Sequence, residues 1–323
     1  MKLLVTGAAG FIGSNFVRMI AKGELQGISH VKILDKLTYA GVKSNLDSVA
    51  NLSHYDFIKG DICDPLVTAE VLREVDAVLN FAAESHVDRS ILGAAAFVQT
   101  NIVGVQVLLD AIVASGRNIR FLQVSTDEVY GSIKSGSWTE DWPLQPNSPY
   151  SASKASGELL VSSYNRTHGM DVVITRCSNN YGTHHFPEKL IPLFITNLIE
   201  GKKVPVYGTG ENVRDWLHVD DHCRGIYSVL MNGRSGDIYN IGGGRELTNN
   251  EITSMILEAM GADNSSIEYV EDRKGHDLRY SVDWTKINRE LGYEPKVKFE
   301  NGLRNTIQWY RDNEAWWKPL KNR

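Results

Sequence analysis

The sequence predicts an α/β protein, with a doubly wound parallel sheet followed by a smaller carboxyl-terminal α/β domain. Three observations predict this class. Short apolar runs alternate with helical patterns over the first half of the chain, as in βαβ units. The runs are nearly continuous in apolar residues, which is typical of strands covered on both faces. From about residue 181 the loops lengthen and the helical patterns shorten, which indicates a second domain.

The expected elements follow from these patterns, with a domain boundary near residue 180. In residues 1–180, strands are expected at Lys2–Thr6, Val31–Asp35, Asp56–Lys59, Ala77–Ala82, Arg120–Ser125 and Val172–Arg176, and helices at Ser14–Ala21, Leu66–Val75, Ala95–Ser115 and Pro149–His168. In residues 181–323, helices are expected at Ile191–Glu200, Asp221–Asn232, Asn250–Met260 and Gly302–Asn313, separated in part by short strands. No low-complexity linker separates the parts, so some later segments are free to return to the first sheet.

Composition narrows the possible partners. The 323 residues include 39 acidic and 34 basic side chains, a net charge of −5, so bulk charge attracts neither nucleic acid nor an anionic membrane. No run approaches the roughly 18 consecutive apolar residues of a membrane span. Cys63, Cys177 and Cys223 are far apart and form no disulfide framework, which predicts a reducing, cytoplasmic location. No set of His, Cys and carboxylate residues has ligand spacing, so no metal is expected.

A glycine-rich turn predicts dinucleotide binding. Gly7, Gly10 and Gly13 lie between the first expected strand and helix, where backbone amides and the helix N-terminus can bind a pyrophosphate. This spacing alone is a weak signal, because such turns also pack helices on strands. Asp35 ends the second strand, where a carboxylate accepts hydrogen bonds from an adenosine ribose and repels a 2′-phosphate. The pattern favours a Rossmann sheet that binds NAD over NADP, although Asp35 could also be a solvated turn residue.

A second pattern predicts proton transfer. Tyr150 and Lys154 are spaced i, i+4 at the start of an expected helix and therefore share one helical face. A nearby ammonium favours tyrosinate and lowers the pKa of the tyrosine. Such a tyrosine can remove a proton from an alcohol while hydride leaves the same carbon for a nicotinamide. Lys154 alone could equally belong to a solvated face.

These motifs resemble the extended short-chain dehydrogenase/reductases that act on nucleotide sugars. The chain is similar to the dTDP-glucose 4,6-dehydratase family from residue 2 to its tail, in the segments AAESHVDRS (82–90), VSTDEVYGS (124–132), NSPYSASKA (147–155), TRCSNNYG (175–182), PEKLIP (187–192), NVRDWLHVDDH (212–222) and DRKGHDLRY (272–280). It departs from the family at YGTHHFP (181–187), where the family usually has YGP, and this departure leaves the substrate preference open.

The resemblance implies a lyase that converts dTDP-glucose to dTDP-4-keto-6-deoxyglucose. Tyr150, assisted by Lys154 and Thr126, would deprotonate the sugar C4 hydroxyl as hydride passes to NAD. Glu128 would then remove the C5 proton while Asp127 protonates the leaving C6 hydroxyl. Hydride finally returns to C6, so NAD would start and end oxidised and stay bound. Adjacent carboxyl groups can divide these roles if their pKa values differ.

The family pattern also implies the binding residues. For NAD they are Gly7, Gly10, Phe11, Ile12, Gly13, Asp35, Lys36, Leu37, Thr38, Asp61, Ile62, Phe81, Ala82, Ala83, Ser85, Thr100, Ser125, Tyr150, Lys154, Cys177 and Asn180. For the nucleotide sugar they are Ser85, Thr126, Asn179, Lys189, Leu190, Pro205, Val206, Tyr207, Arg214, Asn249, Arg273, His276 and Tyr280, most of them in a carboxyl-terminal substrate domain.

Alternatives remain at this point. An NAD-dependent nucleotide-sugar epimerase or decarboxylase would share most motifs, but the pair Asp127-Glu128 argues against both. A non-catalytic NAD-sensing protein would have no need for this pair together with Tyr150 and Lys154. The broad apolar surface of the helix Ala95–Ser115, with the resemblance, predicts a homodimer through a helix bundle; a wholly intramolecular helix is the alternative.

Overall fold

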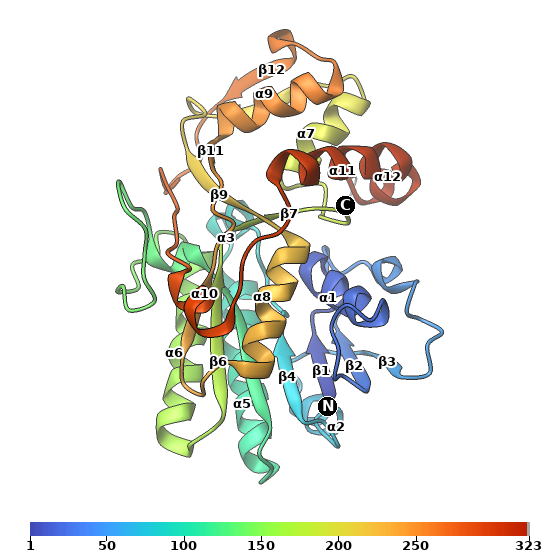
Figure 1. Ribbon diagram of the computed structural model, residues 1–323, viewed down its shortest axis with the longest axis vertical. Helices are drawn as coiled ribbons and strands as arrows, with labels where there is room; N and C mark the ends of the chain where they lie inside the picture. The colour runs from blue at the N-terminus through green and yellow to red at the C-terminus, as the bar shows by residue number, and fades with distance from the viewer. Residues whose placement is uncertain (322–323) are drawn as a thin grey trace.

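A computed structural model describes residues 1–321 of the chain. Its centre is a sheet of seven parallel strands in the order β10-β6-β5-β4-β1-β2-β3 (Figure 1). The strands of this sheet are β1 (Lys2–Thr6), β2 (His30–Asp35), β3 (Tyr55–Lys59), β4 (Ala77–Asn80), β5 (Arg120–Thr126), β6 (Val172–Cys177) and β10 (Ile238–Ile241). The strand order reverses on either side of β1, as in a doubly wound fold. The predicted fold class is confirmed.

Helices cover both faces of this sheet. The helices of this layer are α1 (Phe11–Ala21), α2 (Pro65–Val71), α3 (Val87–Leu92), α4 (Ala95–Val98), α5 (Val105–Ala114), α6 (Pro149–His168), α8 (Val219–Asn232) and α10 (Thr285–Leu291), with the 3-10 turns η1 (Lys43–Leu46) and η3 (Asp127–Tyr130). Leu3 and Val5 face a core shared with α1, α8 and α10, whereas Leu4 faces a core shared with α2, α5 and α6. This alternation explains why the strand is apolar at successive positions.

The expected helix at residues 95–115 is interrupted. Six residues of π-helix, η2 (Gln99–Gly104), separate α4 from α5. Asn101 in this turn is buried and donates to Ser153 Oγ on α6 (2.8 Å) and to Glu84 O (3.0 Å). Within the described residues the span Ala95–Ala114 is also the one helix long and apolar enough, by length and composition alone, to cross a membrane; 39% of its most apolar window is buried.

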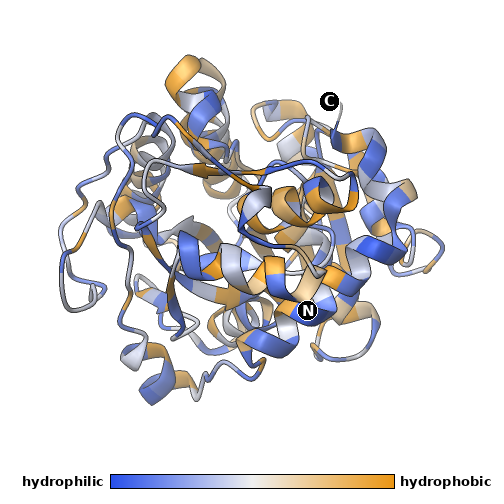
Figure 2. Ribbon diagram, turned by 90° about the horizontal axis from the view of Figure 1, so that it is seen from above, coloured by the Kyte–Doolittle hydropathy of each residue, from blue (hydrophilic) through white to orange (hydrophobic). Residues whose placement is uncertain are grey.

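The remaining elements form a smaller α/β layer at the carboxyl ends of the large sheet (Figure 1). They are β7 (Asn179–Tyr181), α7 (Leu190–Ile199), β8 (Val204–Tyr207), β9 (Val213–His218), β11 (Glu246–Thr248), α9 (Asn249–Met260), η4 (Asn264–Ser266), β12 (Ile267–Val270), α11 (Phe299–Asp312) and α12 (Glu314–Lys321). The strands make two small sheets, β11-β9-β7 and β12-β8. Seen from above, hydrophobic and hydrophilic residues alternate along the helices, as in helices with one buried face (Figure 2).

The chain crosses between the two layers more than once. After β9, helix α8 and strand β10 return to the large sheet, where Ile238–Ile241 pairs with Ile174–Cys177 of β6. The sequence allowed for such a return of later segments to the first sheet. Because of it, no single position in the chain divides one layer from the other. The division of the chain at residue 180 remains a prediction.

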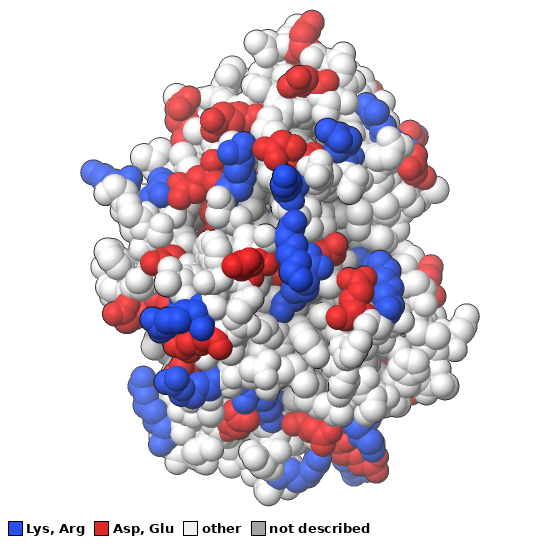
Figure 3. Space-filling model, viewed as in Figure 1, with Lys and Arg blue, Asp and Glu red and all other residues white. Residues whose placement is uncertain are grey.

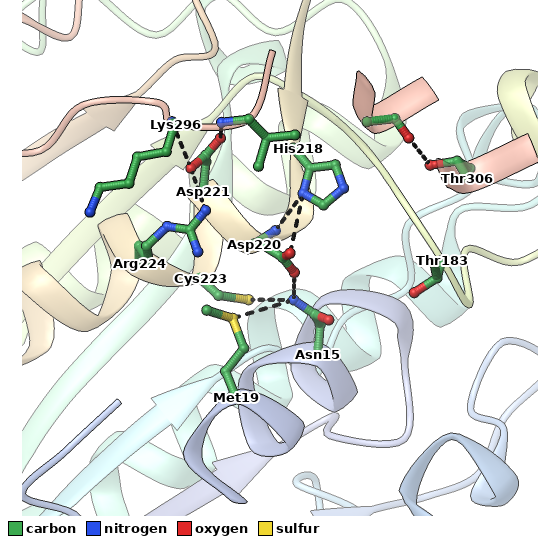
Figure 4. A network of polar contacts seen from close by, with 12 residues as sticks. Asn15, Met19, Thr183, His218, Asp220, Asp221, Cys223, Arg224, Lys296 and Thr306 are labelled. Carbon is green, nitrogen blue, oxygen red and sulfur yellow. Dashed lines mark hydrogen bonds and ion pairs between the residues drawn. The ribbon is translucent and has the colours of Figure 1, made fainter. Parts of the chain in front are cut away.

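The contact between α1 and α8 fastens a returning segment to the start of the chain (Figure 4). Asn15 Nδ2 donates to Asp220 Oδ1 at 2.8 Å and lies 3.6 Å from Cys223 Sγ. On the far side of α8, Asp221 accepts hydrogen bonds from the backbone amides of Lys296 and Val297, at 2.9 and 2.8 Å. Polar contacts therefore hold α8 between the first helix and the segment that leads into α11.

A buried ion pair joins α6 to β6. Glu158 and Arg176 are 2% and 3% exposed, and Arg176 Nη2 lies 2.6 Å from Glu158 Oε2. Arg176 Nη1 also donates to the Tyr130 hydroxyl at 2.7 Å, and that hydroxyl donates to Asn240 Oδ1 at 2.8 Å. The pair therefore connects α6, β6, η3 and β10. Because both charges are buried, each depends on its partner.

We expect Glu158→Gln to lower the free energy of unfolding by about 3–5 kcal/mol, because the Arg176 charge loses its counter-charge while still buried. Urea denaturation measures this change. In the control, Glu70→Gln, the exposed ion pair with Arg73 is lost instead, and the cost should stay below about 1 kcal/mol. Equal costs for the two variants would contradict the proposed importance of the buried pair.

Candidate active site

A pocket opens at the carboxyl ends of β1, β2, β4 and β5, where α/β sheets of this topology bind ligands. All the residues expected to bind the cofactor line it except Leu37. Leu37 has a positive φ of 58° and its amide donates to Asp35 Oδ1 at 2.7 Å, while its side chain packs against the core beside α1. Leu37 therefore shapes the loop after β2 and does not line the pocket.

The glycine-rich turn needs glycine for close approach. Gly7 has a φ of 68°, and a Cβ at this position would lie 2.5 Å from the Ala82 backbone nitrogen. The amide of Ala9 donates to Asp35 Oδ2 at 2.8 Å. The carboxylate predicted to bind a ribose thus also fixes the turn, since its two oxygens accept from Ala9 and Leu37.

The segment Thr126-Asp127-Glu128 places two carboxyl groups in the pocket. Strand β5 ends at Thr126 and the 3-10 turn η3 starts at Asp127, with the Glu128 amide donating to Thr126 Oγ1 at 3.3 Å. Consecutive residues of a strand point to opposite faces, so this departure from strand geometry is required for both carboxyls to face one ligand. All three residues line the pocket.

The two carboxyl groups differ in their electrostatic surroundings. Burial raises the pKa of Asp127 well above its usual range, and the nearby charges of Glu128 and Asp215 raise it further. Burial also raises the pKa of Glu128, but the cations Arg273, Arg214 and Lys189 oppose that rise. Asp127 therefore favours the protonated form, and Glu128 holds its negative charge more readily. This division suits an acid beside a base.

Tyr150 and Lys154 lie side by side in the first turns of α6. The helix starts from Ser148 with a capping box to Ser151, followed by Pro149 at its first position. Lys154 Nζ donates to the Val124 carbonyl at 2.7 Å, and burial lowers its pKa to about 8. The expected lowering of the pKa of Tyr150 is wrong for this structure: burial, and then the charge of Glu128, raise it well above its usual value.

A second pocket adjoins the first and shares Ser85, Glu128, Asn179, Asn180, His185, Glu188 and Lys189 with it. The residues expected to bind substrate that line it are Ser85, Asn179, Lys189, Leu190, Pro205, Val206, Tyr207, Arg214, Asn249, Arg273 and His276. Thr126 lines the first pocket instead. Tyr280 lines neither of the two: its ring lies 4.1 Å from the Arg214 guanidinium carbon, and its hydroxyl donates to Asp277.

Several basic side chains line the second pocket, although the protein as a whole has more acidic than basic residues. Lys189, Arg214 and Arg273 all line it, whereas acidic and basic side chains are interspersed over the outer face seen in Figure 3. Nine residues that line the two pockets carry a buried polar side-chain atom without a hydrogen-bond partner in the part of the chain that the structure describes; they include Ser125 Oγ, Asp127 Oδ2 and Asn179 Oδ1. Buried polar atoms require partners, so these fit a site for polar ligands.

Several pocket residues were not predicted from the sequence. The first pocket is also lined by Tyr39, Ala40, Gly41, Glu84, His185, Phe186 and Glu188, and the second by His86, Asp88 and Trp216. The quoted family segments contain four of these residues, Glu84, His86, Asp88 and Glu188. The family resemblance could therefore have indicated them as pocket residues. Tyr39 and His185 lie in no such segment. Among residues 1–321, no cluster of three or more His, Cys, Asp or Glu is arranged to hold a metal.

Comparison with known proteins identifies the class first. Residues 4–306 match the family model described as GDP-mannose 4,6 dehydratase, and the chain belongs to this family of nucleotide-sugar dehydratases. Within it, the chain is 56% identical to a dTDP-glucose 4,6-dehydratase of Streptomyces niveus, over 100% of this chain and 96% of that protein.

Two solved structures extend the comparison. DesIV, a dTDP-glucose 4,6-dehydratase from Streptomyces venezuelae with NAD and TYD bound, is 58% identical with a TM-score of 0.98, over 99% of this chain and 100% of that one. The dTDP-glucose 4,6-dehydratase of Bacillus anthracis, in complex with NAD, is 48% identical with a TM-score of 0.91, over 99% of both chains.

One histidine behind the pocket makes the site sensitive to acid. His222 is fully buried, and its Nδ1 lies 3.0 Å from Oδ1 of Asn180, which lines both pockets. Burial lowers the pKa of His222 to about 3. Below about pH 6.5 the unfolded chain binds a proton at this residue that the folded chain does not, so this contribution to stability is lost as the pH falls.

We expect the free energy of unfolding to decrease less steeply with falling pH in His222→Gln than in the wild type. The wild type should lose about 1.4 kcal/mol more per pH unit than the variant between about pH 6 and pH 4, because only the wild type carries this titration. Urea denaturation at several pH values measures the difference. His54→Gln, at an exposed turn, is the control and should keep the wild-type slope; equal slopes for all three proteins would contradict the prediction.

Proposed function

We propose that this protein is an NAD-dependent dTDP-glucose 4,6-dehydratase, a hydro-lyase that forms dTDP-4-keto-6-deoxyglucose. One observation carries the proposal: the acid–base pair Asp127 and Glu128 lines the same pocket as Tyr150 and Lys154. A tyrosine and lysine alone suit oxidation of an alcohol. The added pair of carboxyls suits elimination of water, which needs both an acid and a base.

The cofactor pocket fits NAD. The glycine-rich turn exposes backbone to a pyrophosphate, and the carboxylate of Asp35 disfavours a 2′-phosphate. When bound, NAD accepts hydride from the sugar and later returns it. Lys36 also lines this pocket, where it forms an ion pair with Asp61 at 2.6 Å.

The remaining chemistry is assigned to side chains of this chain. Tyr150 removes the C4 hydroxyl proton; burial raises its pKa, and the side-chain hydrogen bond with Thr126 opposes that rise. Lys154 lies one helical turn away on the same face of α6. The resulting 4-ketone acidifies the C5 proton, which Glu128 removes. Asp127, whose pKa is raised by burial, donates a proton to the leaving C6 hydroxyl, and a proton then returns to C5. Balanced over the cycle, the sugar loses one water and the cofactor is unchanged.

The substrate-binding role falls to the second pocket. We assign the diphosphate to Lys189, Arg214 and Arg273, since arginine pairs well with phosphate oxygens. Lys189 Nζ already lies 3.0 Å from the Ser85 carbonyl, and Arg214 Nη2 lies 2.9 Å from the Asp277 carbonyl. These cations also favour the charged form of Glu128. The same three side chains would therefore support both diphosphate binding and removal of the C5 proton.

A direct assay tests the activity. Purified protein is mixed with dTDP-glucose without added NAD, and the product mass and NADH absorbance are followed. Loss of one water without lasting NADH supports the dehydratase. An unchanged mass with inverted C4 configuration would instead identify an epimerase, loss of carbon dioxide from a uronic acid substrate a decarboxylase, and no turnover a sensor.

Two variants should separate the steps. Tyr150→Phe should slow the first oxidation by about 10²–10⁴-fold, because the proton acceptor is lost. The double variant Asp127→Asn with Glu128→Gln should still give transient NADH absorbance but lose water much more slowly. Stopped-flow absorbance and product mass distinguish the two outcomes. Dehydration by the double variant at the parent rate would refute the assigned roles.

We propose that the protein is a homodimer. The helix Ala95–Ala114 is mostly apolar, yet only 39% of its most apolar window is buried within one chain, and Leu159 on the adjacent α6 is 62% exposed. A second copy packed on α5 and α6 would cover both. Polar contacts among Gln106, Asp110 and Tyr164 on these helices favour a protein partner over lipid. We also propose a cytoplasmic location, in keeping with the unpaired Cys63, Cys177 and Cys223.

Leu159→Glu should convert the dimer to a monomer, because a buried carboxylate without a partner is costly. Light scattering after gel filtration measures the mass. Leu66→Glu introduces the same charge at another exposed leucine, on α2, and should leave the dimer intact. A dimeric Leu159→Glu protein, or a monomeric parent, would contradict the proposed interface.

A further inference from the structure

The segment 183–188 crosses the mouth of the first pocket. It connects β7 to α7, and its residues His185, Phe186 and Glu188 line the pocket. The opposite wall is the loop after β2, with Tyr39, Ala40 and Gly41. A cofactor held on the glycine-rich turn would lie in the pocket that both of these segments line.

On one side of the pocket, one ion pair and two contacts with the Tyr39 ring join these two walls. Arg89 Nη2 on α3 lies 3.3 Å from Glu188 Oε2, and its guanidinium carbon lies 3.9 Å from the centre of the Tyr39 ring. Tyr39 in turn meets Phe186 edge to face, with ring centres 5.6 Å apart. Arg89 thus contacts both walls at once and holds Glu188 against the loop after β2.

The carboxyl-terminal helices hold the other side of the segment. The His184 ring lies 4.3 Å from the Trp309 ring of α11 and 5.6 Å from the Trp316 ring of α12. Trp316 Nε1 donates to Asn45 Oδ1 at 3.0 Å. The segment is therefore packed against aromatic side chains in the place where the family usually has proline.

These contacts reach the turn that binds the pyrophosphate. Asn45 Nδ2 donates to the carbonyl of Ala9, in the glycine-rich turn, at 3.0 Å. His185 stacks on Phe11 at the start of α1, with ring centres 4.1 Å apart and planes 11° apart. The segment thus rests directly on the element that the cofactor contacts.

Polar atoms at this mouth lack partners. His185 Nδ1 is buried with no hydrogen bond to any described residue. The Tyr39 hydroxyl and the Glu188 carboxylate, also buried, have at most each other as partners, and all three side chains line the pocket. Unpaired buried polar atoms are uncommon and require explanation. A polar ligand between the walls would supply the missing partners.

We propose that Arg89, Tyr39 and Glu188 form a clasp that retains NAD through the catalytic cycle. The inference rests on the proposed function, because a dehydratase must keep the reduced cofactor between hydride removal at C4 and hydride return at C6. The clasp residues are positioning residues: they act by closing the pocket mouth and take no part in proton transfer. Their loss should therefore change cofactor release before it changes the chemistry on the bound sugar.

The release rate of NAD tests the clasp. Purified protein is freed of loose nucleotide by gel filtration, its NAD content per chain is measured, and released NAD is trapped by an excess of an NAD-consuming enzyme. Arg89→Met keeps the aliphatic stem but removes the charge, and Glu188→Gln keeps the shape. Each should speed NAD release by about three- to fivefold, the upper part of the range expected when a partly exposed ion pair is lost. The double variant should release NAD no faster than the faster single variant, because one contact is shared.

An ion pair away from the two pockets provides a control for effects of charge removal that do not involve the cofactor. Arg245 and Glu300 form an exposed ion pair at 3.1 Å, and neither lines the two pockets. Arg245→Met should leave the NAD release rate within about twofold of the parent, since exposed pairs contribute little. The midpoint of thermal unfolding in the presence of excess NAD should stay close to the parent in all these variants, which separates retention from a loss of fold.

The outcomes are distinct. If the parent holds NAD and dehydrates dTDP-glucose, but Glu188→Gln releases NAD at the parent rate, the clasp is wrong and the proposed function stands. If Arg89→Met does not fold, the shape-conserving Glu188→Gln still decides. If the parent binds no NAD, the proposed function fails and the clasp fails with it.

Discussion

A line of hydrogen bonds inside the central sheet sets the geometry on which the site depends. Thr6 Oγ1 donates to Asn80 Oδ1 at 2.5 Å, and Asn80 Nδ2 donates to Gln123 Oε1 at 2.8 Å, so that buried side chains join β1, β4 and β5. These three strands end at the glycine-rich turn, at Phe81-Ala82 and at Thr126. Their register therefore fixes the distances between the glycine-rich turn and the carboxyl groups of Asp127 and Glu128. The next residue, Val124, offers its carbonyl to Lys154, so the same strand also positions the helix that carries Tyr150.

The two layers contribute groups of opposite charge to the site. The sheet layer contributes the carboxyl groups and buries them, which by itself favours their neutral forms. The smaller layer contributes Arg214, Arg273 and Lys189, which act on Glu128 more than on Asp127. The difference between acid and base therefore arises across the boundary between layers. A net charge of −5 is compatible with an anionic substrate because these few cations lie where the phosphates are expected.

Sequence patterns predicted the features that depend on neighbours along the chain. Continuous apolar runs marked β1 to β6, the glycines marked the turn, and the spacing of Tyr150 and Lys154 placed both on one helix face. Contacts between distant segments were not predictable in this way: the pairing of β10 with β6, the departure of Leu37 from the pocket, and the contact of Tyr39 with Arg89 depend on folding. The direction of the pKa of Tyr150 was also wrong, because sequence shows a nearby lysine but not how completely both groups are buried.

The return of the chain to the sheet has a consequence for biosynthesis. Strand β10 is made only after β7, β8 and β9, so the edge of β6 stays unpaired until residues 238–241 have left the ribosome. An unpaired edge of a parallel sheet invites pairing with another chain. The large sheet is therefore completed only after β7, β8 and β9 of the smaller layer have been synthesised.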